Sequence, residues 1–232
     1  MRGFFFETKM EKKLKVIVTG VTGMVGEGVM HECLLNDNVA EVLIISRREA
    51  GHSHPKLKTI VHGDMQNIEA IKEQIRGYDA CFFCLGVSSV GMKEEQYTKF
   101  TYDLTLGFAK TMAEVNPNCV FTYVSGANTD SSEKGKSMWA RVKGKTENDL
   151  LKLFPNGYMF RPGYMHPTPG LKYTLKYYKY ITWMYPVLKL LFPGAASTLA
   201  DLGRAMLQVA FKGYGKRILE VRDIKKCAAA LV

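Results

Sequence analysis

The sequence predicts an α/β fold, a doubly wound parallel β-sheet with helices on both faces and a small helical lid toward the C-terminus. Short β-branched runs alternate with longer segments in which apolar residues recur at helical spacing, as in parallel sheets whose crossovers are helices. The chain has 232 residues, of which 47% are hydrophobic and 23% charged, so it can bury one full core but not two large ones.

The first strand, helix and second strand form one β-α-β unit. Residues 14–19 are a β-branched strand, residues 24–35 have an apolar stripe at helical spacing, and residues 41–46 make the second strand. The alternation then continues. In chain order we expect a strand at 57–62, a short helix with Ile68, Ile71 and Ile75 facing inward, a strand at 80–85, a helix at 94–115, a strand at 120–124, a helix at 137–153 and a strand at 158–161.

Both ends of the chain depart from this pattern. Residues 1–13 lack the apolar stretch of a signal peptide and predict a loose leader ahead of a single domain at 14–232. Prolines and glycines punctuate the chain after the last strand, and we expect a lid or substrate lobe at about 164–197. A final helix begins near Thr198, whose hydroxyl, with Asp201 three positions on, suits a helix N-terminus.

The segment 171–192 of this lobe is rich in tyrosine and lysine, and three uses compete for it. It can close an apolar substrate pocket, lie on an acidic membrane or a partner, or pack on the core as a helix pair with its lysines in solvent. Lysines at 172, 176 and 179 recur about once per turn, which favours a lid that also packs on the core. No window reaches the roughly 18 uncharged apolar residues of a membrane-spanning helix.

The formal net charge is +10, which favours an anionic partner: a phosphorylated cofactor, nucleic acid or an acidic membrane. We expect no nucleic acid, because the basic residues are spread along the chain and no nucleic-acid-binding signature occurs. Five cysteines without an export signal indicate buried thiols in a reducing compartment and hence a cytoplasmic protein. The five histidines lack metal-ligand spacing, so we expect no metal.

Three glycines spaced three apart stand between the first strand and the first helix, in Thr19-Gly20-Val-Thr-Gly23-Met-Val-Gly26. The first permits a tight turn, the second lets the backbone approach a pyrophosphate, and the third lets the helix pack closely on the strand. The helix N-terminus adds free N–H groups and the positive end of its dipole. The turn predicts a Rossmann-type dinucleotide site with contacts at Gly20, Thr22, Gly23, Met24, Val25 and Gly26.

The second strand ends in Ser46-Arg47-Arg48, about 20 residues past the glycines, where such sites meet the adenosine ribose. An acidic residue there binds the ribose hydroxyls of NAD, whereas a guanidinium pairs with the 2′-phosphate of NADP. No carboxylate stands in this triplet. The sequence therefore favours NADP(H) over NAD(H), with solvated arginines at a strand end as the alternative.

Three further motifs follow later strands: Gly63-Asp64-Met65, Cys84-Leu85-Gly86 and Arg161-Pro162-Gly163. With the glycine turn, they resemble the atypical or extended branch of the short-chain dehydrogenases/reductases, which includes nucleotide-sugar epimerase-like proteins. The resemblance implies a homodimer through the helices at 94–115 and 137–153. It also implies cofactor contacts at Asp64, Met65, Leu85, Gly86, Pro162 and Gly163, although a turn-forming aspartate is an equal alternative at position 64.

The catalytic set of this family is a Ser or Thr after the fifth strand and Tyr-x-x-x-Lys on the next helix. Here the matching residues are Ser125 and Trp139-Ala-Arg-Val-Lys143, so Lys143 fits the motif and Trp139 stands at the tyrosine position. In the family the lysine holds the nicotinamide ribose and lowers the pKa of the tyrosine, which exchanges a proton with the substrate. An indole N–H can donate a hydrogen bond but does not ionise in the useful range.

Three replacements for the missing proton donor stay open. Ser125 can polarise a carbonyl while water delivers the proton, Tyr164 or a lid tyrosine can reach in, or Lys143 can act with its pKa lowered by burial. The sequence thus supports two functions. One is an NADP(H)-dependent oxidoreductase or epimerase-like enzyme acting on a small molecule, and the other is a non-catalytic NADP(H)-binding redox sensor or scaffold.

Overall fold

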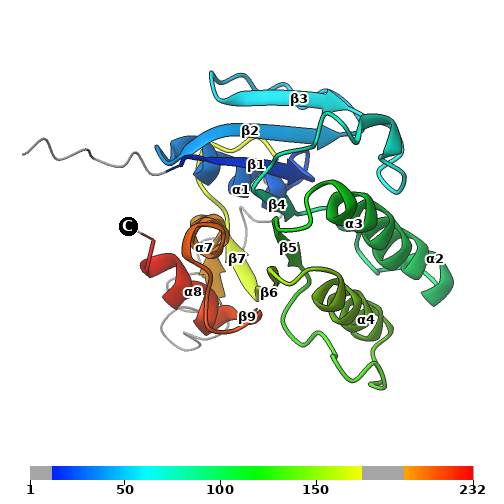
Figure 1. Cartoon of the computed structure of the whole chain (residues 1–232). Helices are drawn as coiled ribbons and strands as arrows, with labels where there is room; N and C mark the ends of the chain where they lie inside the picture. Colours follow the sequence, from blue (N-terminus) through cyan, green and yellow to red (C-terminus); the bar gives the residue numbers. More distant parts are fainter. Residues whose placement is uncertain (1–11, 174–195, 232) are drawn as a thin grey trace, which may run out of the picture.

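The computed structural model describes residues 12–173 and 196–231, and its centre is a seven-stranded sheet in which every neighbouring pair is parallel (Figure 1). In spatial order the strands are β3 (Leu57–Val61), β2 (Val39–Ser46), β1 (Leu14–Thr19), β4 (Ala80–Phe83), β5 (Val120–Val124), β6 (Gly157–Arg161) and β9 (Ile218–Glu220). The carboxyl ends therefore meet at one edge, and the strand order reverses between β1 and β4.

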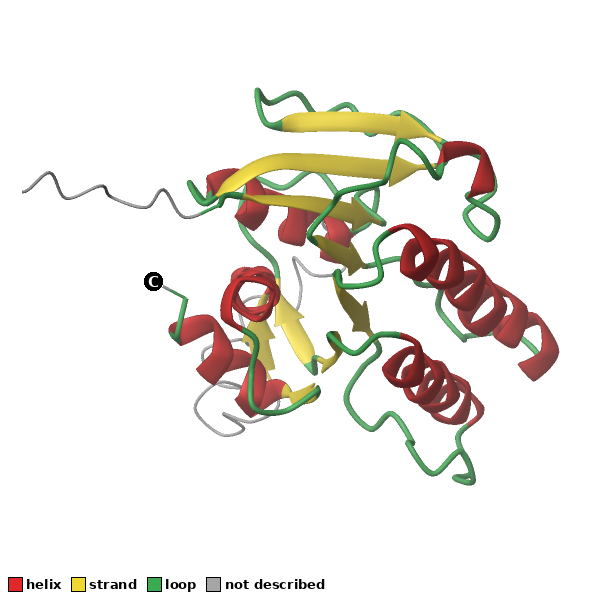
Figure 2. Ribbon diagram, in the orientation of Figure 1, coloured by secondary structure: helices red, strands yellow, loops and turns green. Residues whose placement is uncertain are grey.

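Helices cover both faces of this sheet (Figure 2). They are α1 (Met24–Leu35), α2 (Glu94–Thr98), α3 (Leu104–Val115), α4 (Met138–Leu153), α7 (Leu199–Lys212) and α8 (Val221–Ala229). Val16 and Val18 of β1 pack with α1, α7 and α8, whereas Ile17 packs with α3 and α4 on the opposite face. Side chains alternate along a strand, so a strand buried on both faces is apolar throughout. This is the predicted doubly wound arrangement.

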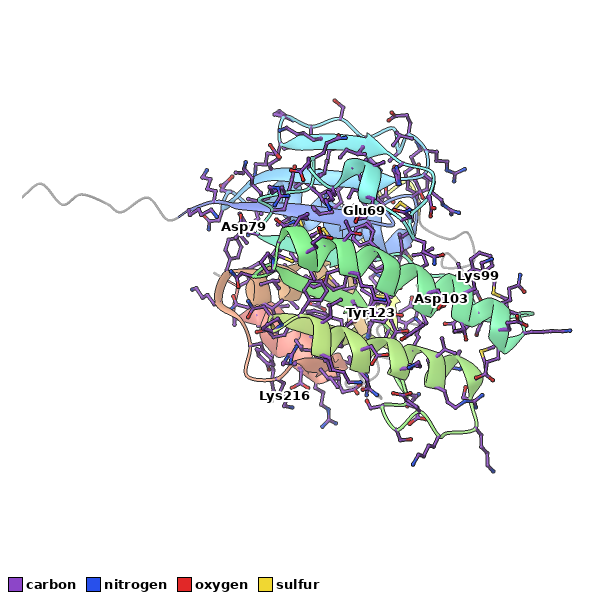
Figure 3. The ribbon with its side chains drawn as sticks, turned by 45° about the vertical axis from the view of Figure 1, so that its right-hand side comes forward. Glu69, Asp79, Lys99, Asp103, Tyr123 and Lys216 are labelled. Atoms are coloured by element: carbon purple, nitrogen blue, oxygen red, sulfur yellow. The ribbon has the colours of Figure 1, made fainter. Side chains whose placement is uncertain are left out.

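Most predicted elements are confirmed, but two crossovers differ from the prediction. Between β3 and β4 only the three-residue 3-10 turn η1 (Glu69–Ile71) forms, although Ile68, Ile71 and Ile75 are buried as expected. The helix expected at 94–115 is divided by the π-helical turn η2 (Lys99–Asp103), whose end residues are labelled in Figure 3. Such turns widen the hydrogen-bond ring by one residue, which apolar spacing alone does not reveal.

The last helix begins as predicted, with a reciprocal cap at its first turn. Asp201 N–H donates to Thr198 Oγ1 and Thr198 N–H donates to Asp201 Oδ2, each at 2.9 Å. The sequence analysis missed β9 and α8, which follow this helix. A strand of three residues is too short to show an alternating pattern.

The predicted lid is described only in part. Its two ends, β7 (Tyr164–His166) and β8 (Ala196–Thr198), pair in parallel as a separate two-stranded sheet. Most of the tyrosine- and lysine-rich segment, and most of the predicted leader, lie outside the described residues, at 174–195 and 1–11. Within the described ranges, no helix combines the length and the apolar character that crossing a bilayer requires.

Candidate cofactor and catalytic site

The turn between β1 and α1 leaves no room for a side chain at two of its glycines. Gly20 has a φ of +73°, and a Cβ there would lie 2.6 Å from the carbonyl oxygen of Cys84, just past β4. A Cβ at Gly26 would lie 2.3 Å from the Gly20 carbonyl oxygen. Gly23 caps α1, and its N–H donates to that same oxygen at 2.9 Å. The glycines therefore bring the start of α1 against the ends of β1 and β4.

At the start of α1, backbone N–H groups rather than side chains are available to bind a ligand. The hydrogen bond from the Glu27 N–H to the Gly23 carbonyl, at 3.0 Å, begins the helical ladder. The N–H groups of Met24, Val25 and Gly26 precede it and have no intrahelical acceptor, by the geometry of an α-helix. Met24 and Val25 turn their side chains into the core. A helix start of this kind attracts anions.

A cavity of about 380 Å³ opens at the carboxyl ends of β1, β2 and β4. Its lining residues all belong to the predicted cofactor set: Gly20, Thr22, Ser46, Arg47, Arg48, Met65 and Leu85. A larger cavity of about 560 Å³ lies between α3 and α4. The smaller one lies where open parallel sheets bind ligands, beyond the carboxyl ends of their strands and at the point where the strand order reverses.

The polar residues around this cavity have distinct local roles. Arg47 and Arg48 are exposed directly after β2, and the Ser46 hydroxyl donates to the Arg48 carbonyl at 2.6 Å, which fixes their turn. Asp64 accepts the backbone N–H groups of Gln66 and Asn67, at 3.0 and 3.2 Å. The structure therefore shows the turn-forming role that the sequence offered for Asp64. The other predicted contacts do not line this cavity: Gly23, Met24, Val25, Gly26, Asp64, Gly86, Lys143, Pro162 and Gly163.

Ser125, Trp139 and Lys143 come together where β5 meets α4. The Lys143 ammonium donates to the Ser125 carbonyl, and Cζ3 of Trp139 lies 3.9 Å from the place a Cβ would occupy on Gly126. The Ser125 hydroxyl is buried and donates to Glu147 Oε1 at 2.5 Å. It therefore points to the interior, and the residue that faces the indole is Gly126.

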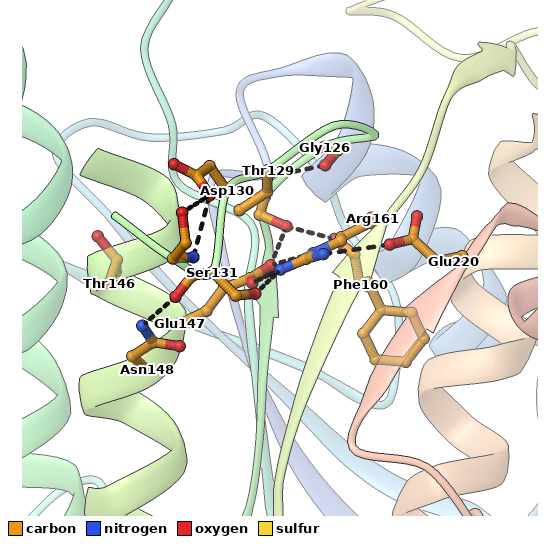
Figure 4. A network of polar contacts seen from close by, with 12 residues as sticks. Gly126, Thr129, Asp130, Ser131, Thr146, Glu147, Asn148, Phe160, Arg161 and Glu220 are labelled. Atoms are coloured by element: carbon orange, nitrogen blue, oxygen red, sulfur yellow. Dashed lines mark hydrogen bonds and ion pairs between the residues drawn. The ribbon is translucent and has the colours of Figure 1, made fainter. Parts of the chain in front are cut away.

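The carboxylate that accepts the Ser125 hydroxyl belongs to a buried ion pair, Glu147–Arg161, which was not predicted from the sequence (Figure 4). Glu147 is fully buried, and Arg161 Nε donates to its two carboxylate oxygens at 3.1 and 3.2 Å. The Arg161 guanidinium also donates to Ser131 Oγ at 2.5 Å and Glu220 Oε1 at 3.2 Å. A signal was available: Arg161 is a charge in an apolar strand, and Glu147 lies one turn past Lys143. Buried charges need such partners.

Burial changes the acidity of two groups here. Burial lowers the pKa of Lys143 to about 8, although the negative charge of Glu147 acts in the opposite direction. Lys143 can therefore give up a proton close to neutral pH. Burial raises the pKa of Cys84 to about 12, so the thiol beside the glycine turn stays protonated and is a poor nucleophile.

Comparison with known proteins identifies relatives of part of this chain. The profile of the NAD dependent epimerase/dehydratase family matches residues 16–140. The mitochondrial protein FMP52 of Debaryomyces hansenii is 26% identical over 153 residues, which are 65% of this chain and 66% of that protein. The mitochondrial protein fmp52 of Emericella nidulans is 31% identical over 156 residues, 64% of this chain and 65% of that protein. The chain thus spans just under two thirds of these relatives.

Solved structures match most of the chain. The Bordetella bronchiseptica enzyme WbmF in complex with NAD+ covers 92% of this chain, and the match spans 77% of that enzyme, with a TM-score of 0.61 at 13% identity. An identity this low supports the fold alone. The α/β fold predicted from the sequence is confirmed.

The comparisons correct the predicted location. The cytoplasmic prediction is wrong, because several fungal relatives are named mitochondrial proteins. Free cysteines argue only against an oxidising compartment. They do not distinguish the cytoplasm from a mitochondrion.

Proposed function

Because the chain belongs to the NAD dependent epimerase/dehydratase family, we propose that it binds NADP(H) at the cavity between β1, β2 and β4. We further propose that it is an oxidoreductase or epimerase-like enzyme acting on a small molecule, on a single domain at 14–232. One observation carries the proposal: the glycine turn and the guanidinium groups of Arg47 and Arg48 meet in one cavity.

The residues present fit this cofactor. The N–H groups at the start of α1 would hold the pyrophosphate, and Arg47 and Arg48 would hold the 2′-phosphate by paired hydrogen bonds. Two guanidinium groups and no carboxylate in the triplet that ends β2 favour NADP(H) over NAD(H). The remaining contacts that we propose are Asp64, Met65, Leu85, Gly86, Pro162 and Gly163.

The bound dinucleotide would supply or accept the hydride, and side chains of the protein would transfer the proton. Lys143 would hold the nicotinamide ribose and exchange a proton, which a pKa of about 8 supports. Trp139 would shape the substrate side and offer a hydrogen bond from its indole N–H. Ser125 would donate to a substrate carbonyl only after its hydroxyl turns away from Glu147.

A second function, NADP(H) binding without turnover, is favoured by a specific observation. The family transfers the proton with a tyrosine and a serine or threonine, and neither hydroxyl is available to a substrate here. Trp139 stands at the tyrosine position, and the Ser125 hydroxyl already donates to the buried Glu147 carboxylate. A redox sensor or scaffold would need the cofactor cavity alone.

We also propose a homodimer through α3 and α4, the helix pair that the family resemblance implies. The cavity between them combines apolar side chains such as Leu106 and Leu153 with opposite charges on Lys110 and Asp149. Asp149 already pairs with Lys145 and Lys152 on its own helix, so a twofold contact would rest on the apolar side chains. Analytical ultracentrifugation tests this, and a monomer at every accessible concentration would refute the dimer.

Calorimetric titration of NADPH and NADH at fixed salt tests the proposed cofactor. The proteins are wild type, Arg47→Ala, Arg48→Ala and the control Arg222→Ala, an exposed arginine of α8 that does not line the cavity. We expect NADPH to bind at least about tenfold tighter than NADH, or about 1.4 kcal/mol. That preference should shrink in the two cavity variants only. Binding of neither nucleotide would refute the proposal.

The substitution Trp139→Tyr separates the two functions. Wild type and variant are compared for NADPH oxidation with a panel of aldehydes, ketones and nucleotide sugars. If the wild type is an enzyme that uses the indole, the variant loses activity. If the wild type only binds cofactor, it shows no turnover. Any activity that the variant then gains comes from the tyrosine, which restores the family's proton donor.

A further inference from the structure

The loop after β2 carries Arg47 and Arg48 and has no helix or strand over residues 47–56. Its position decides where the two guanidinium groups lie relative to the glycine turn. The hydrogen bond from the Ser46 hydroxyl to the Arg48 carbonyl fixes only its start. Beyond that point the middle of the loop meets Lys172 and Tyr173, which lie more than a hundred positions away in the sequence.

Lys172 and Tyr173 contact three successive positions of the loop. The Tyr173 hydroxyl donates to the Ala50 carbonyl at 3.2 Å, and its ring meets the His52 ring edge-on with centroids 6.0 Å apart. Lys172 Nζ lies over Gly51, 3.2 Å from the place a Cβ would occupy. Gly51 has a φ of +64°, which lets the loop turn back toward Tyr173.

Glu27 in turn holds the backbone of Lys172 and Tyr173. The residue is 1% exposed, its Oε1 accepts the Lys172 N–H at 2.8 Å, and its Oε2 accepts the Tyr173 N–H at 2.6 Å. His52 Nε2 lies 3.8 Å from Oε1, so the loop also reaches this carboxylate directly. Glu27 stands in the first turn of α1, one residue past the glycine motif. The buried carboxylate therefore links the loop to the helix that begins at the glycine turn.

We infer that Glu27 and Tyr173 are positioning residues that hold the loop of Arg47 and Arg48 at a fixed place beside the glycine turn, and so set the preference for NADP(H). The inference rests on the proposed function, because it assigns the pyrophosphate to α1 and the 2′-phosphate to the loop. It adds a part of the predicted lid to the cofactor site, at the adenosine end.

A purely structural role makes a different prediction. If Glu27 and Tyr173 only stabilised the fold, their loss would lower the unfolding temperature and weaken NADPH and NADH equally. If they position the loop, their loss costs NADPH more, because only NADPH carries the 2′-phosphate that the loop binds. The ratio of the two dissociation constants therefore separates the two roles.

The experiment uses the full chain with Tyr173→Phe, Glu27→Gln and the control Tyr78→Phe. The Tyr78 hydroxyl donates to Glu41 at 2.5 Å, before β4 and away from the carboxyl ends of the strands. NADPH and NADH are titrated by calorimetry, and amide hydrogen exchange of residues 47–54 is measured without ligand. We expect Tyr173→Phe to weaken NADPH about fivefold and NADH less than about twofold, from the loss of one hydrogen bond. Exchange in the loop should accelerate, with Tyr78→Phe unchanged in both measurements.

Equal weakening of both nucleotides, or unchanged loop exchange in Tyr173→Phe, would overturn the inference. Tyr173→Phe keeps every contact except one hydrogen bond, so it remains informative if Glu27→Gln fails to fold. If the wild type binds neither nucleotide, the proposed function fails. The exchange of residues 47–54 then still decides whether Tyr173 holds the loop.

Discussion

Replacing the half-buried Lys143 by methionine should stabilise the protein at neutral pH. Burial lowers the pKa of this lysine from 10.5 to about 8, which corresponds to a cost of about 3 kcal/mol for holding the charged form in the folded state. Methionine keeps the length of the side chain without the charge. It loses the hydrogen bond to the Ser125 carbonyl, worth about 1 kcal/mol. The net expected gain is about 2 kcal/mol at pH 7.

The pH dependence distinguishes this cause from better packing. Below about pH 8 both the folded and the unfolded wild type hold the Lys143 proton, and the full cost is present. Between about pH 8 and 10.5 the unfolded chain binds more protons at this residue, so the stability of the wild type rises with pH. The advantage of Lys143→Met should therefore shrink by about 2 kcal/mol between pH 7 and about pH 9.5.

Urea unfolding of both proteins at the two pH values measures this difference. Other titrating groups occur in both proteins and cancel in the comparison. A variant less stable than wild type at pH 7 would refute a costly buried ammonium. An advantage that does not change with pH would refute the lowered pKa.

Three further predictions concern the residues that support the cavity and the β5–α4 junction. Glu147→Gln breaks the buried pair with Arg161 and should cost about 3 to 5 kcal/mol in urea unfolding, whereas Lys152→Gln, on the exposed end of α4, should cost less than about 0.5 kcal/mol; equal effects would contradict the buried pairing. Thr198→Ala removes the reciprocal cap of α7 and should lower stability by about 1 kcal/mol, while Thr198→Asp should retain most of it. Gly26→Ala places a Cβ 2.3 Å from the Gly20 carbonyl, so it should displace the turn and weaken NADPH binding at least about tenfold; wild-type affinity would show that α1 need not approach β1 this closely.

Local patterns predicted the turn and the strand ends that meet at the cavity between β1, β2 and β4. The glycine turn, the arginines after β2 and the Trp139–Lys143 spacing each occupy a short stretch of sequence. The parallel topology then brings the ends of β1, β2 and β4 to one edge without further information. The same reasoning found the cap at Thr198, because a capping box is also local.

Contacts between distant segments could not be predicted in this way. Glu27 meets Lys172 and Tyr173 across about 145 residues, and no spacing in the sequence records that contact. The Glu147–Arg161 pair likewise joins a helix to a strand. Arg161 stands out as a charge in an apolar strand, but no spacing in the sequence identifies Glu147 as its partner. The sequence placed Ser125 directly after β5, as the structure does. Only the structure shows that its hydroxyl faces Glu147 rather than the indole of Trp139.

The 2′-phosphate of bound NADPH provides the most direct test of the central claim. The measurement is a pH titration of its ³¹P resonance with the protein in excess. The second pKa of such a phosphate is about 6 in water, and two guanidinium groups favour the dianion. We predict that this pKa falls by at least about one unit in wild type and returns toward its value in water in Arg47→Ala and Arg48→Ala. A 2′-phosphate that titrates in the wild-type complex as it does in free NADPH would contradict the account.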